Sequence, residues 1–378
     1  MQVEQYSWTA EAGWKAEKDR GLSQKANLVL CFGGIDIVHN QERFDELTKM
    51  YPNAHIVMGS TAGEIIDQRV QDDTITASAL YYEKTPLQFV EIDVANFNSS
   101  RECGKAISEA LRKEDLNHVL VISDGSMVNG DDLVTGINEN LPKEVVVTGG
   151  LAADAGRFSK TYVGLDKVPE SGKIVAIGHY GKELRVGHGS KGGWDEFGPI
   201  RTVTRSEGNV LYELDGQNAL TLYKKYLGDK AEELPGSALL FPLSLYCNDG
   251  TQLVRTILSI DEEEGTMTFA GDIPQNAEVR LMMANFDRLI DGAANAAEAC
   301  YTKLEDHDPE FVLMISCIGR KIVLDQRIEE EVEGVFEVFG EDVVYSGFYS
   351  NGEISPVLES VGCALHNQTM TITTYSEN

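Results

Sequence analysis

The sequence lacks the features that mark secreted, metal-binding and membrane-spanning proteins. Its six cysteines stand singly, with no CxxC pair and no histidine at ligand spacing, which argues against a disulfide framework and a zinc site. The seven histidines form no HxxxH or similar cluster, so we predict no metal and no cofactor. No stretch approaches the roughly 18 apolar residues of a membrane-spanning helix, and the charged start has no signal-peptide core. We therefore expect a cytoplasmic protein.

Positive charge is also scarce. The chain of 378 residues has 32 Lys and Arg against 61 Asp and Glu, which gives a formal net charge of −29. A field of this sign repels phosphate backbones and anionic lipid, so nucleic acid and membrane surfaces are not expected as partners. Hydrophobic residues make up 42% of the chain, which is typical of a folded protein, and the length suggests two domains.

Three segments of the chain follow the order strand, helix, strand. They span residues 26–59, 118–154 and 311–354, and in each an amphipathic helix separates two apolar runs. In the first segment Asn40 is the predicted N-cap of the helix. Such units place two parallel strands in one sheet, with the helix on one face of it.

Antiparallel hairpins are predicted around these units. They pair residues 74–83 with 87–94, 172–181 with 182–190, and 357–367 with 368–375. The predicted fold class is therefore α/β (mixed α+β), with two domains, residues 1–205 and 206–378, whose mixed sheets combine the repeated units with hairpins. Gly187, Gly189 and Gly192 are predicted to make a flexible loop, and the small residues of the helix at 284–304 predict close packing on a sheet.

Polar and glycine-containing motifs directly follow the predicted strands. The run "TAGEI" at residues 61–65 and the run "SNGEI" at residues 350–354 share the same ending. Ligands of open α/β sheets bind at the carboxyl ends of the strands, where loops diverge and backbone amides are free. The predicted ligand-binding residues are Thr61, Gly63, Glu64, Ser123, Asp124, Thr148, Gly150, Trp194, Cys317, Arg320, Tyr349, Ser350, Gly352 and Glu353.

Each of these predictions has a structural alternative. The repeated motif also fits a strand-to-turn junction in which a glycine makes the turn and the glutamate caps an amide or faces water. Arg320 fits an anion clamp or a surface ion pair, and Cys317 fits a packed thiol or a nucleophile. Trp194 fits a ligand-stacking residue or a lid that packs on the core.

Six segments taken together resemble the FIST family, named for F-box and intracellular signal transduction proteins. They are "GSTAGEI", "VTGGLAAD", "VTRSEGNVLYELDGQNAL", "FAGDIPQNAEVRLM", "SCIGRK" and "GFYSNGEISP", in the order of the family, the first two in its N-terminal domain and the others in its C-terminal domain. The resemblance implies an intracellular sensory module that binds a small ligand such as an amino acid. Since the two FIST parts use up the chain, such a sensor would act through a separate signalling partner.

Three functions remain open at this point. The first is a sensor that grips an amino-acid-like ligand between Arg320 and Glu353. The second is an enzyme in the same cleft, with Cys317 or Ser123 as nucleophile beside Asp124, although no histidine is placed as its base. The third is an interaction scaffold whose acidic surface binds a basic partner.

Overall fold

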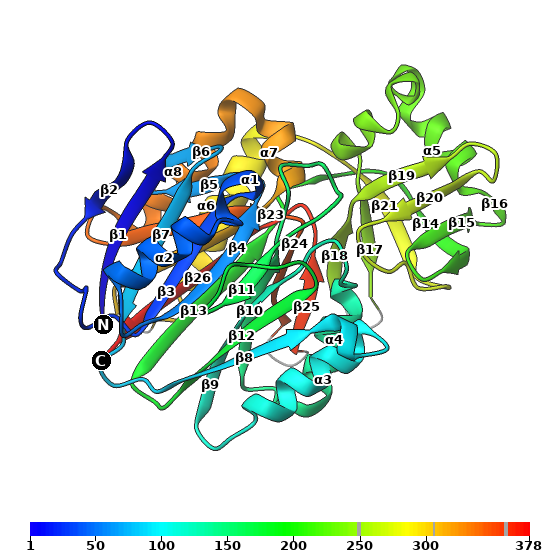
Figure 1. Ribbon diagram of the computed structural model, residues 1–378. Coiled ribbons are helices and arrows are strands. Elements are labelled where there is room, and N and C mark those ends of the chain that lie inside the picture. Colours follow the sequence, from blue (N-terminus) through cyan, green and yellow to red (C-terminus); the bar gives the residue numbers. More distant parts are fainter. Residues whose placement is uncertain (248–250, 305–306, 359–361) are drawn as a thin grey trace.

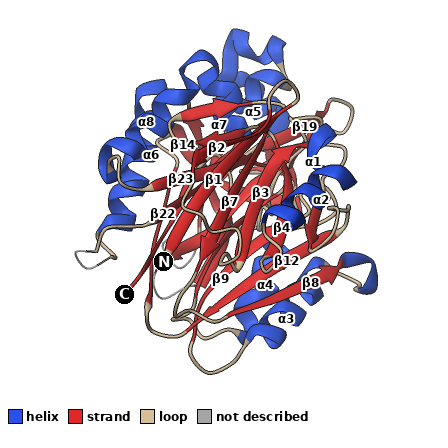
Figure 2. Ribbon diagram, turned by 60° about the vertical axis from the view of Figure 1, so that its left-hand side comes forward, coloured by secondary structure: helices blue, strands red, loops and turns tan. Residues whose placement is uncertain are grey.

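The computed structural model describes residues 1–247, 251–304, 307–358 and 362–378. Within these residues the strands form three six-stranded sheets and one eight-stranded sheet. The three six-stranded sheets make up the body (residues 1–194 and 284–378), and the eight-stranded sheet belongs to a lobe (residues 195–283) at one side of it (Figure 1). Helices cover the outer faces of the sheets (Figure 2). The predicted α/β class with mixed sheets and two structural units is confirmed.

The first sheet has the order β11-β4-β3-β7-β1-β2. Its strands are β1 (Gln2–Thr9), β2 (Gly13–Lys18), β3 (Leu28–Gly34), β4 (His55–Thr61), β7 (Ile75–Tyr81) and β11 (Val163–Leu165). Helices α1 (Ile35–Val38) and α2 (Gln41–Met50) join the parallel strands β3 and β4. Asn40 caps α2 as predicted, because its side chain accepts a hydrogen bond from the amide of Glu42 at 2.8 Å.

The second sheet has the order β25-β24-β10-β9-β12-β8. Its strands are β8 (Leu87–Asp93), β9 (Leu116–Ser123), β10 (Val146–Leu151), β12 (Lys173–Tyr180), β24 (Gly352–Leu358) and β25 (Gly362–His366). Helix α3 (Ser100–Leu111) precedes β9, and α4 (Gly130–Asn140) joins β9 to its parallel neighbour β10.

The third sheet has the order β13-β26-β22-β23-β5-β6. Its strands are β5 (Glu64–Ile66), β6 (Arg69–Gln71), β13 (Leu184–Lys191), β22 (Phe311–Cys317), β23 (Val344–Ser350) and β26 (Met370–Glu377). Helix α6 (Phe286–Tyr301) precedes β22, and α7 (Ile318–Leu324) and α8 (Ile328–Phe339) join β22 to the parallel strand β23.

The three sheets repeat one pattern. Each centres on two parallel strands and has an antiparallel strand beside the first of them: β7 beside β3, β12 beside β9, and β26 beside β22. The second parallel strand pairs with a strand that comes from another repeat: β4 with β11, β10 with β24, and β23 with β5. The three predicted strand-helix-strand units are therefore confirmed. Each repeat also contributes strands to the sheet of another: β5 and β6 join the third sheet, β11 joins the first, and β24 and β25 join the second.

The predicted hairpins are wrong. Strand β7 lies in the first sheet and β8 in the second, β12 in the second and β13 in the third, and β25 in the second and β26 in the third. Residues 359–361 of the last predicted hairpin lie outside the described residues. At residues 83–85 the backbone amides donate to the carboxylate of Glu377, rather than to the partner strand of a hairpin. After these residues the chain leaves the first sheet and continues as β8, an edge strand of the second sheet.

The lobe is inserted in the third repeat, between β13 and α6. Its strands are β14 (Asp195–Glu207), β15 (Val210–Leu214), β16 (Gln217–Asn218), β17 (Leu243–Tyr246), β18 (Gln252–Arg255), β19 (Ile257–Asp261), β20 (Thr266–Phe269) and β21 (Glu278–Met283). Helix α5 (Ala219–Leu227) packs its buried residues Leu220 and Tyr223 into a core separate from those of the body. The domain boundary predicted at residue 205 falls within β14, and the third sheet contains strands from both sides of it.

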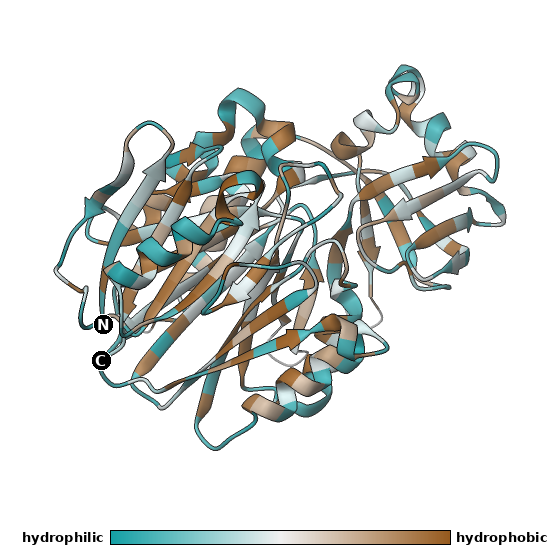
Figure 3. Ribbon diagram, in the orientation of Figure 1, coloured by the Kyte–Doolittle hydropathy of each residue, from teal (hydrophilic) through white to brown (hydrophobic). Residues whose placement is uncertain are grey.

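The central core of the body draws on all three sheets. Phe32 of β3, Ile122 of β9 and Phe348 of β23 belong to one buried cluster, in which the rings of Phe32 and Phe348 lie 4.4 Å apart. Apolar residues concentrate on the strands, whereas the connecting loops are mostly hydrophilic (Figure 3). No helix among the described residues is both long and apolar enough to cross a membrane.

Helix α6 lies close against the third sheet because small residues meet there. Ala293, Ala296 and Ala297 of α6 are fully buried, which confirms the packing predicted from the sequence. On the facing strand β13, a Cβ at Gly187 would lie 2.7 Å from the carbonyl oxygen of Cys300, and one at Gly189 would collide with the helix backbone. Gly187 and Gly189 are therefore strand residues, and the predicted flexible loop is wrong at these positions.

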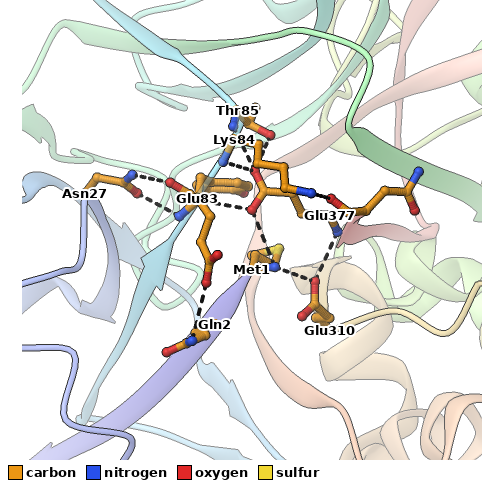
Figure 4. Close-up of polar contacts among 10 residues, drawn as sticks. Met1, Gln2, Asn27, Glu83, Lys84, Thr85, Glu310 and Glu377 are labelled. Carbon is orange, nitrogen blue, oxygen red and sulfur yellow. Dashed lines mark hydrogen bonds and ion pairs between the residues drawn. The ribbon is translucent and has the colours of Figure 1, made fainter.

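The two ends of the chain lie side by side (Figure 1). The Met1 amine is 2.8 Å from a carboxylate oxygen of Glu310 and 3.5 Å from one of Glu377 (Figure 4). Glu377 also accepts hydrogen bonds from the amides of residues 83–85 and from the Thr85 hydroxyl. Burial would raise the pKa of Glu377, but these hydrogen bonds outweigh it and lower the pKa below its usual value.

Candidate functional site

The strand ends of the three repeats meet through equivalent hydrogen bonds. The amide of Ala62 donates to the carbonyl of Tyr349, and the amide of Ala153 to the carbonyl of Ser60, both at 2.9 Å. The amide of Asn351 completes the set by donating to the carbonyl of Leu151 at 3.1 Å. The ends of β4, β10 and β23 are therefore brought together, as the argument from strand ends predicts.

In the first repeat the predicted residues Thr61 and Glu64 bind each other. The Thr61 hydroxyl donates to one oxygen of the fully buried Glu64 carboxylate. The other oxygen accepts from the amide and hydroxyl of Thr74, at 3.1 and 2.7 Å. Burial raises the pKa of Glu64 to about 7, although the hydrogen bonds from Thr61 and Thr74 oppose the shift. Beside this glutamate, Gly63 adopts a φ of 132°, and the Lys321 side chain lies over it.

The third repeat reproduces the arrangement. The Ser350 hydroxyl donates to Glu353 at 2.7 Å, and the amide and hydroxyl of Thr369 donate to its other oxygen at 3.3 and 2.9 Å. Burial raises the pKa of Glu353 to about 8. Both glutamates bind groups of their own repeat and are 0% exposed, so the motif has the geometry of the predicted strand-to-turn junction.

The second repeat uses aspartates instead. Asp124 accepts hydrogen bonds from the amides of Ser126, Met127 and Gly172, and so fixes the loop that leads to α4. Asp154 accepts from the amides of residues 158–160, which lowers its pKa although burial alone would raise it. Both carboxylates therefore shape loops at the strand ends.

Arg320 is bound inside the protein. It is fully buried and pairs with the equally buried Glu331 of α8, at 2.7 Å. Its remaining donors bond the carbonyls of Gly192 and Leu289, at 2.6 and 2.8 Å. The structure therefore places this guanidinium in an internal network and not in a cleft. Tyr349 joins the network, since its hydroxyl donates to Glu331 at 2.8 Å.

Other predicted residues also have internal partners. The Ser123 hydroxyl donates to the carbonyl of Asp124 at 3.0 Å. The hydroxyl oxygen of the buried Thr148 lies 2.9 Å from His118 Nε2. Gly150 and Gly352 lie on the paired strands β10 and β24. Trp194 is 8% exposed, and its indole donates to the carbonyl of Gln368 at 2.9 Å, as expected of a lid packed on the core.

Two adjoining cavities lie where the lobe meets the strand ends of the body. The smaller has a volume of about 170 Å³ and the larger about 320 Å³, and they share Phe158, Leu258, Ala270 and Asn351. Cys317, at the end of β22, is the predicted residue that lines the smaller one. The larger reaches Gly125 and Ser126, directly after Ser123 and Asp124. We call the two cavities together the cleft. The predicted residues lie near the cleft, but the loops that follow them line more of it than the predicted residues themselves do.

Two polar side chains of the cleft were missed by the sequence argument. Thr256, from the lobe, is 5% exposed, and its hydroxyl has no hydrogen-bond partner. The buried carboxamide oxygen of Asn351, from the body, also has none. Asn351 stands inside the repeated motif, so its position after the strand was a usable signal. Thr256 stands in an ordinary strand-like run and gave no such signal.

Cys317 favours binding over nucleophilic chemistry. Burial raises the pKa of its thiol well above the usual value, although the amides of Gln368 and Gly319 donate to the sulfur. The thiol therefore stays protonated, and a protonated thiol is a weak nucleophile. No cluster of three or more His, Cys, Asp or Glu able to hold a metal occurs among the residues that the structure describes.

The lobe is fastened to the body beside the cleft. Arg255 of the lobe, 3% exposed, donates to Asp131 of α4 at 3.0 Å and to the carbonyl of Leu365 at 3.2 Å. Asp131 also accepts from the amide of Asp272 in the lobe at 2.6 Å. The position of the lobe residues that line the cleft therefore depends on these contacts.

A third cavity, of about 890 Å³, lies on the other side of the junction and is lined by Trp194. Three of its charged lining residues have charged partners, since Arg288 is 2.7 Å from Asp195 and Glu196 is 2.5 Å from Arg280. Of the buried side-chain atoms without a hydrogen-bond partner among the described residues, those of Thr256 and Asn351 line the cleft at the strand ends, and none lines this third cavity. We therefore place the candidate site there.

Comparison with known proteins identifies the family. The family model of the FIST N domain matches residues 27–217, and that of the FIST C domain matches residues 219–356. The chain belongs to the FIST family. FIST domains are associated with sensing in signal transduction. In this FIST protein the two matched segments meet within the lobe, at α5.

Two individual similarities are weaker. The FIST protein is 24% identical over 213 residues to the uncharacterized protein MJ1623 of Methanocaldococcus jannaschii. The match covers 52% of this chain and 40% of that protein, so the chain spans less than half of this relative. A crystal structure of cyanuric acid hydrolase from A. caulinodans covers 94% of this chain and 90% of its own, with 9% identity and a TM-score of 0.36. A similarity of that size carries no argument about activity.

Proposed function

We propose that this FIST protein is a cytoplasmic small-ligand sensor that acts through a separate signalling partner. Its ligand would lie in the cleft between the lobe and the strand ends of the body. The observation that carries the proposal is the pair of adjoining cavities with two buried polar atoms that lack partners, Thr256 Oγ1 and Asn351 Oδ1. The six free cysteines support a reducing compartment.

A ligand in this cleft would touch both structural units. Thr256 and Ala270 belong to the lobe, whereas Cys317 and Asn351 belong to the body. A ligand that binds one relative position of lobe and body better than another shifts the population toward that position. Such a shift is the means by which binding would be passed to a partner.

Two ligand classes fit a cleft of this size. The sequence predicted an amino-acid-like ligand gripped by Arg320 and Glu353, but both side chains have internal partners. An amino acid would therefore place an apolar side chain in the cavity and its charges at the mouth. The second class is an uncharged, largely apolar molecule.

A thermal-shift screen of the full chain against amino acids and neutral metabolites tests the proposal. A ligand at 100 times its Kd adds about 2.7 kcal/mol of stability, which raises the melting temperature by a few degrees. Ala270→Phe should abolish the shift, because Ala270 lines both cavities. Ala16→Phe, at an exposed position of β2, should leave the shift unchanged.

Two outcomes would contradict the sensor. A shift that survives Ala270→Phe would place the ligand elsewhere. An absence of shifts, together with capture of a basic protein that weakens steeply with salt, would favour the acidic scaffold instead.

A further inference from the structure

The described lining of the cleft lacks charged side chains, although the chain has an ordinary share of them. Charged residues make up 25% of the chain. None of the described residues that line the smaller or the larger cavity is Asp, Glu, Lys or Arg. A charged group enclosed here would lose its hydration without gaining a counter-ion, which is costly.

The cations next to the lining residues already have partners. Four of them are adjacent in sequence to Phe158, Thr256, Gly319 or Ile322, and each is paired with a carboxylate. Arg157 pairs with Asp36, Arg255 with Asp131, Arg320 with Glu331, and Lys321 with Asp72. A ligand carboxylate would have to compete with these existing partners.

The two unpartnered atoms define what a ligand must offer. A carboxamide oxygen only accepts, so Asn351 Oδ1 requires a donor on the ligand, while the Thr256 hydroxyl can donate or accept. A buried polar atom without a partner costs about 1–3 kcal/mol, which a hydrogen bond from the ligand would recover. A primary amide or an alcohol supplies both functions without carrying a charge.

Apolar side chains surround the mouth of the cleft. Phe158, Leu258 and Ile322 line the smaller cavity and are 54%, 44% and 49% exposed, and Met127 lines the larger and is 60% exposed. Exposed large apolar residues that gather at a concave site are typical of ligand-binding surfaces. An apolar ligand body would cover them.

This inference rests on the proposed function, in which the cleft is the ligand site. We infer that the ligand is an uncharged, largely apolar molecule with a hydrogen-bond donor. Its polar group binds Asn351 Oδ1 and the Thr256 hydroxyl, and its apolar body lies between Leu258 and Ile322. A zwitterionic amino acid is disfavoured because none of the described lining residues carries a charge.

Four probes that share a phenyl ring test this ligand class on the full chain. They are 2-phenylacetamide, which is neutral, phenylacetate, phenethylamine and phenylalanine. Binding is measured by saturation-transfer NMR and titration. We expect 2-phenylacetamide to bind at least about tenfold more tightly than each charged probe, since an unpaired buried charge costs more than 1.4 kcal/mol.

Thr256→Val removes the hydroxyl while keeping the shape of the side chain. It should weaken binding of 2-phenylacetamide about 2- to 10-fold, which corresponds to one neutral hydrogen bond. Thr266→Val, at a buried threonine of the same lobe that does not line the cavities, should leave the affinity unchanged. Equal loss in both variants would overturn the assigned contact.

The outcomes separate the ligand class from the ligand site. Binding of phenylalanine that is tighter than that of 2-phenylacetamide, and is lost in Ala270→Phe, would overturn the uncharged class while the sensor proposal stands. Failure of all four probes to bind at millimolar concentration would overturn the class. If the wider screen also gives no cleft-dependent shift, the proposed site falls with it.

Discussion

Glu64 and Glu353 occupy equivalent positions in two repeats and accept the same set of hydrogen bonds. Each has a hydroxyl donor three residues earlier and a threonine that donates both its amide and its hydroxyl. In the second repeat Ala152 and Ala155 take the places of the hydroxyl residue and the glutamate, since Ala153 donates the same amide bond as Ala62 and Asn351. The first and third repeats thus share the sequence Gly-Glu-Ile at the turn that a buried carboxyl group closes.

Glu353→Gln should change how stability depends on pH. Because burial raises the pKa of Glu353 from 4.5 to about 8, the folded protein binds this proton more tightly than the unfolded chain does. The resulting stabilisation is complete below pH 4.5 and is lost as pH rises through 8. We expect the variant to gain about 2–4 kcal/mol relative to the parent between pH 5 and pH 8, measured by urea unfolding.

The comparison with the parent at each pH removes an opposing effect. Burial lowers the pKa of His179 and His366 to about 4, so their contribution is present above the unfolded value near 6.5 and is lost as pH falls toward 4. Glu333→Gln, at an exposed position of α8, serves as the control. A variant-to-parent difference that stays constant from pH 5 to pH 8 would contradict the buried, protonated glutamate.

Arg320→Met should destabilise the fold, because it leaves the buried Glu331 carboxylate without its counter-ion. Removing one partner of a buried ion pair costs about 3–5 kcal/mol. The double variant Arg320→Met, Glu331→Leu should be more stable than the single variant. Arg327→Ala breaks exposed pairs with Asp287 and Glu330 and should cost less than about 1 kcal/mol. Similar losses in the two single variants, measured by urea unfolding, would count against the internal role.

Glycine at 189 should be required for the packing of α6. Gly189→Ala places a Cβ against the backbone of α6 and should cost about 1–3 kcal/mol, as overpacking does. Gly334→Ala is the matched control, since its Cβ would meet Ala294 of α6 at an ordinary 3.6 Å. That change should stabilise helix α8 by up to about 1 kcal/mol. Thermal unfolding of both variants gives the comparison, and equal effects would contradict the close contact at Gly189.

Asp131→Asn should loosen the lobe from the body. It weakens the pairing with Arg255 and should raise the rate of amide hydrogen exchange in β18 and in β20 near the cleft. We expect a loss of about 1–3 kcal/mol for this contact. Asp132→Asn, one residue further along α4, should leave exchange in the lobe unchanged. Exchange that rises equally across the three sheets of the body would instead indicate global destabilisation.

The local patterns of the sequence predicted elements better than partners. The residue patterns of strands 75–81 and 87–93 are the same whether the two strands pair with each other or lie in different sheets. A hairpin was therefore expected where the chain in fact passes from the first sheet to the second. The parallel pairs were predictable because a strand, a helix and a second apolar run admit few arrangements. The strand lent to another repeat was not, because its partner lies far away in sequence.

The site shows the same division. The strand ends led to the region where the cavities lie. Arg320 was interpreted as a clamp because its partner Glu331 lies eleven residues away in an acidic helix. Glu331 falls on the apolar face of α8 with Val332 and Val335, which was a usable sign of its burial. The missing partner of Thr256 became visible from the tertiary structure alone.

The exchange of strands among the repeats has a consequence for how the protein unfolds. Since β5, β11 and β24 each complete a sheet that belongs to another repeat, loss of one repeat would expose the edge of a neighbour's sheet. The body should therefore melt as one cooperative unit. The lobe, with its own core, can behave as a separate foldon that opens at lower free energy, so ligand-dependent motion need not disturb the interlocked part of the molecule.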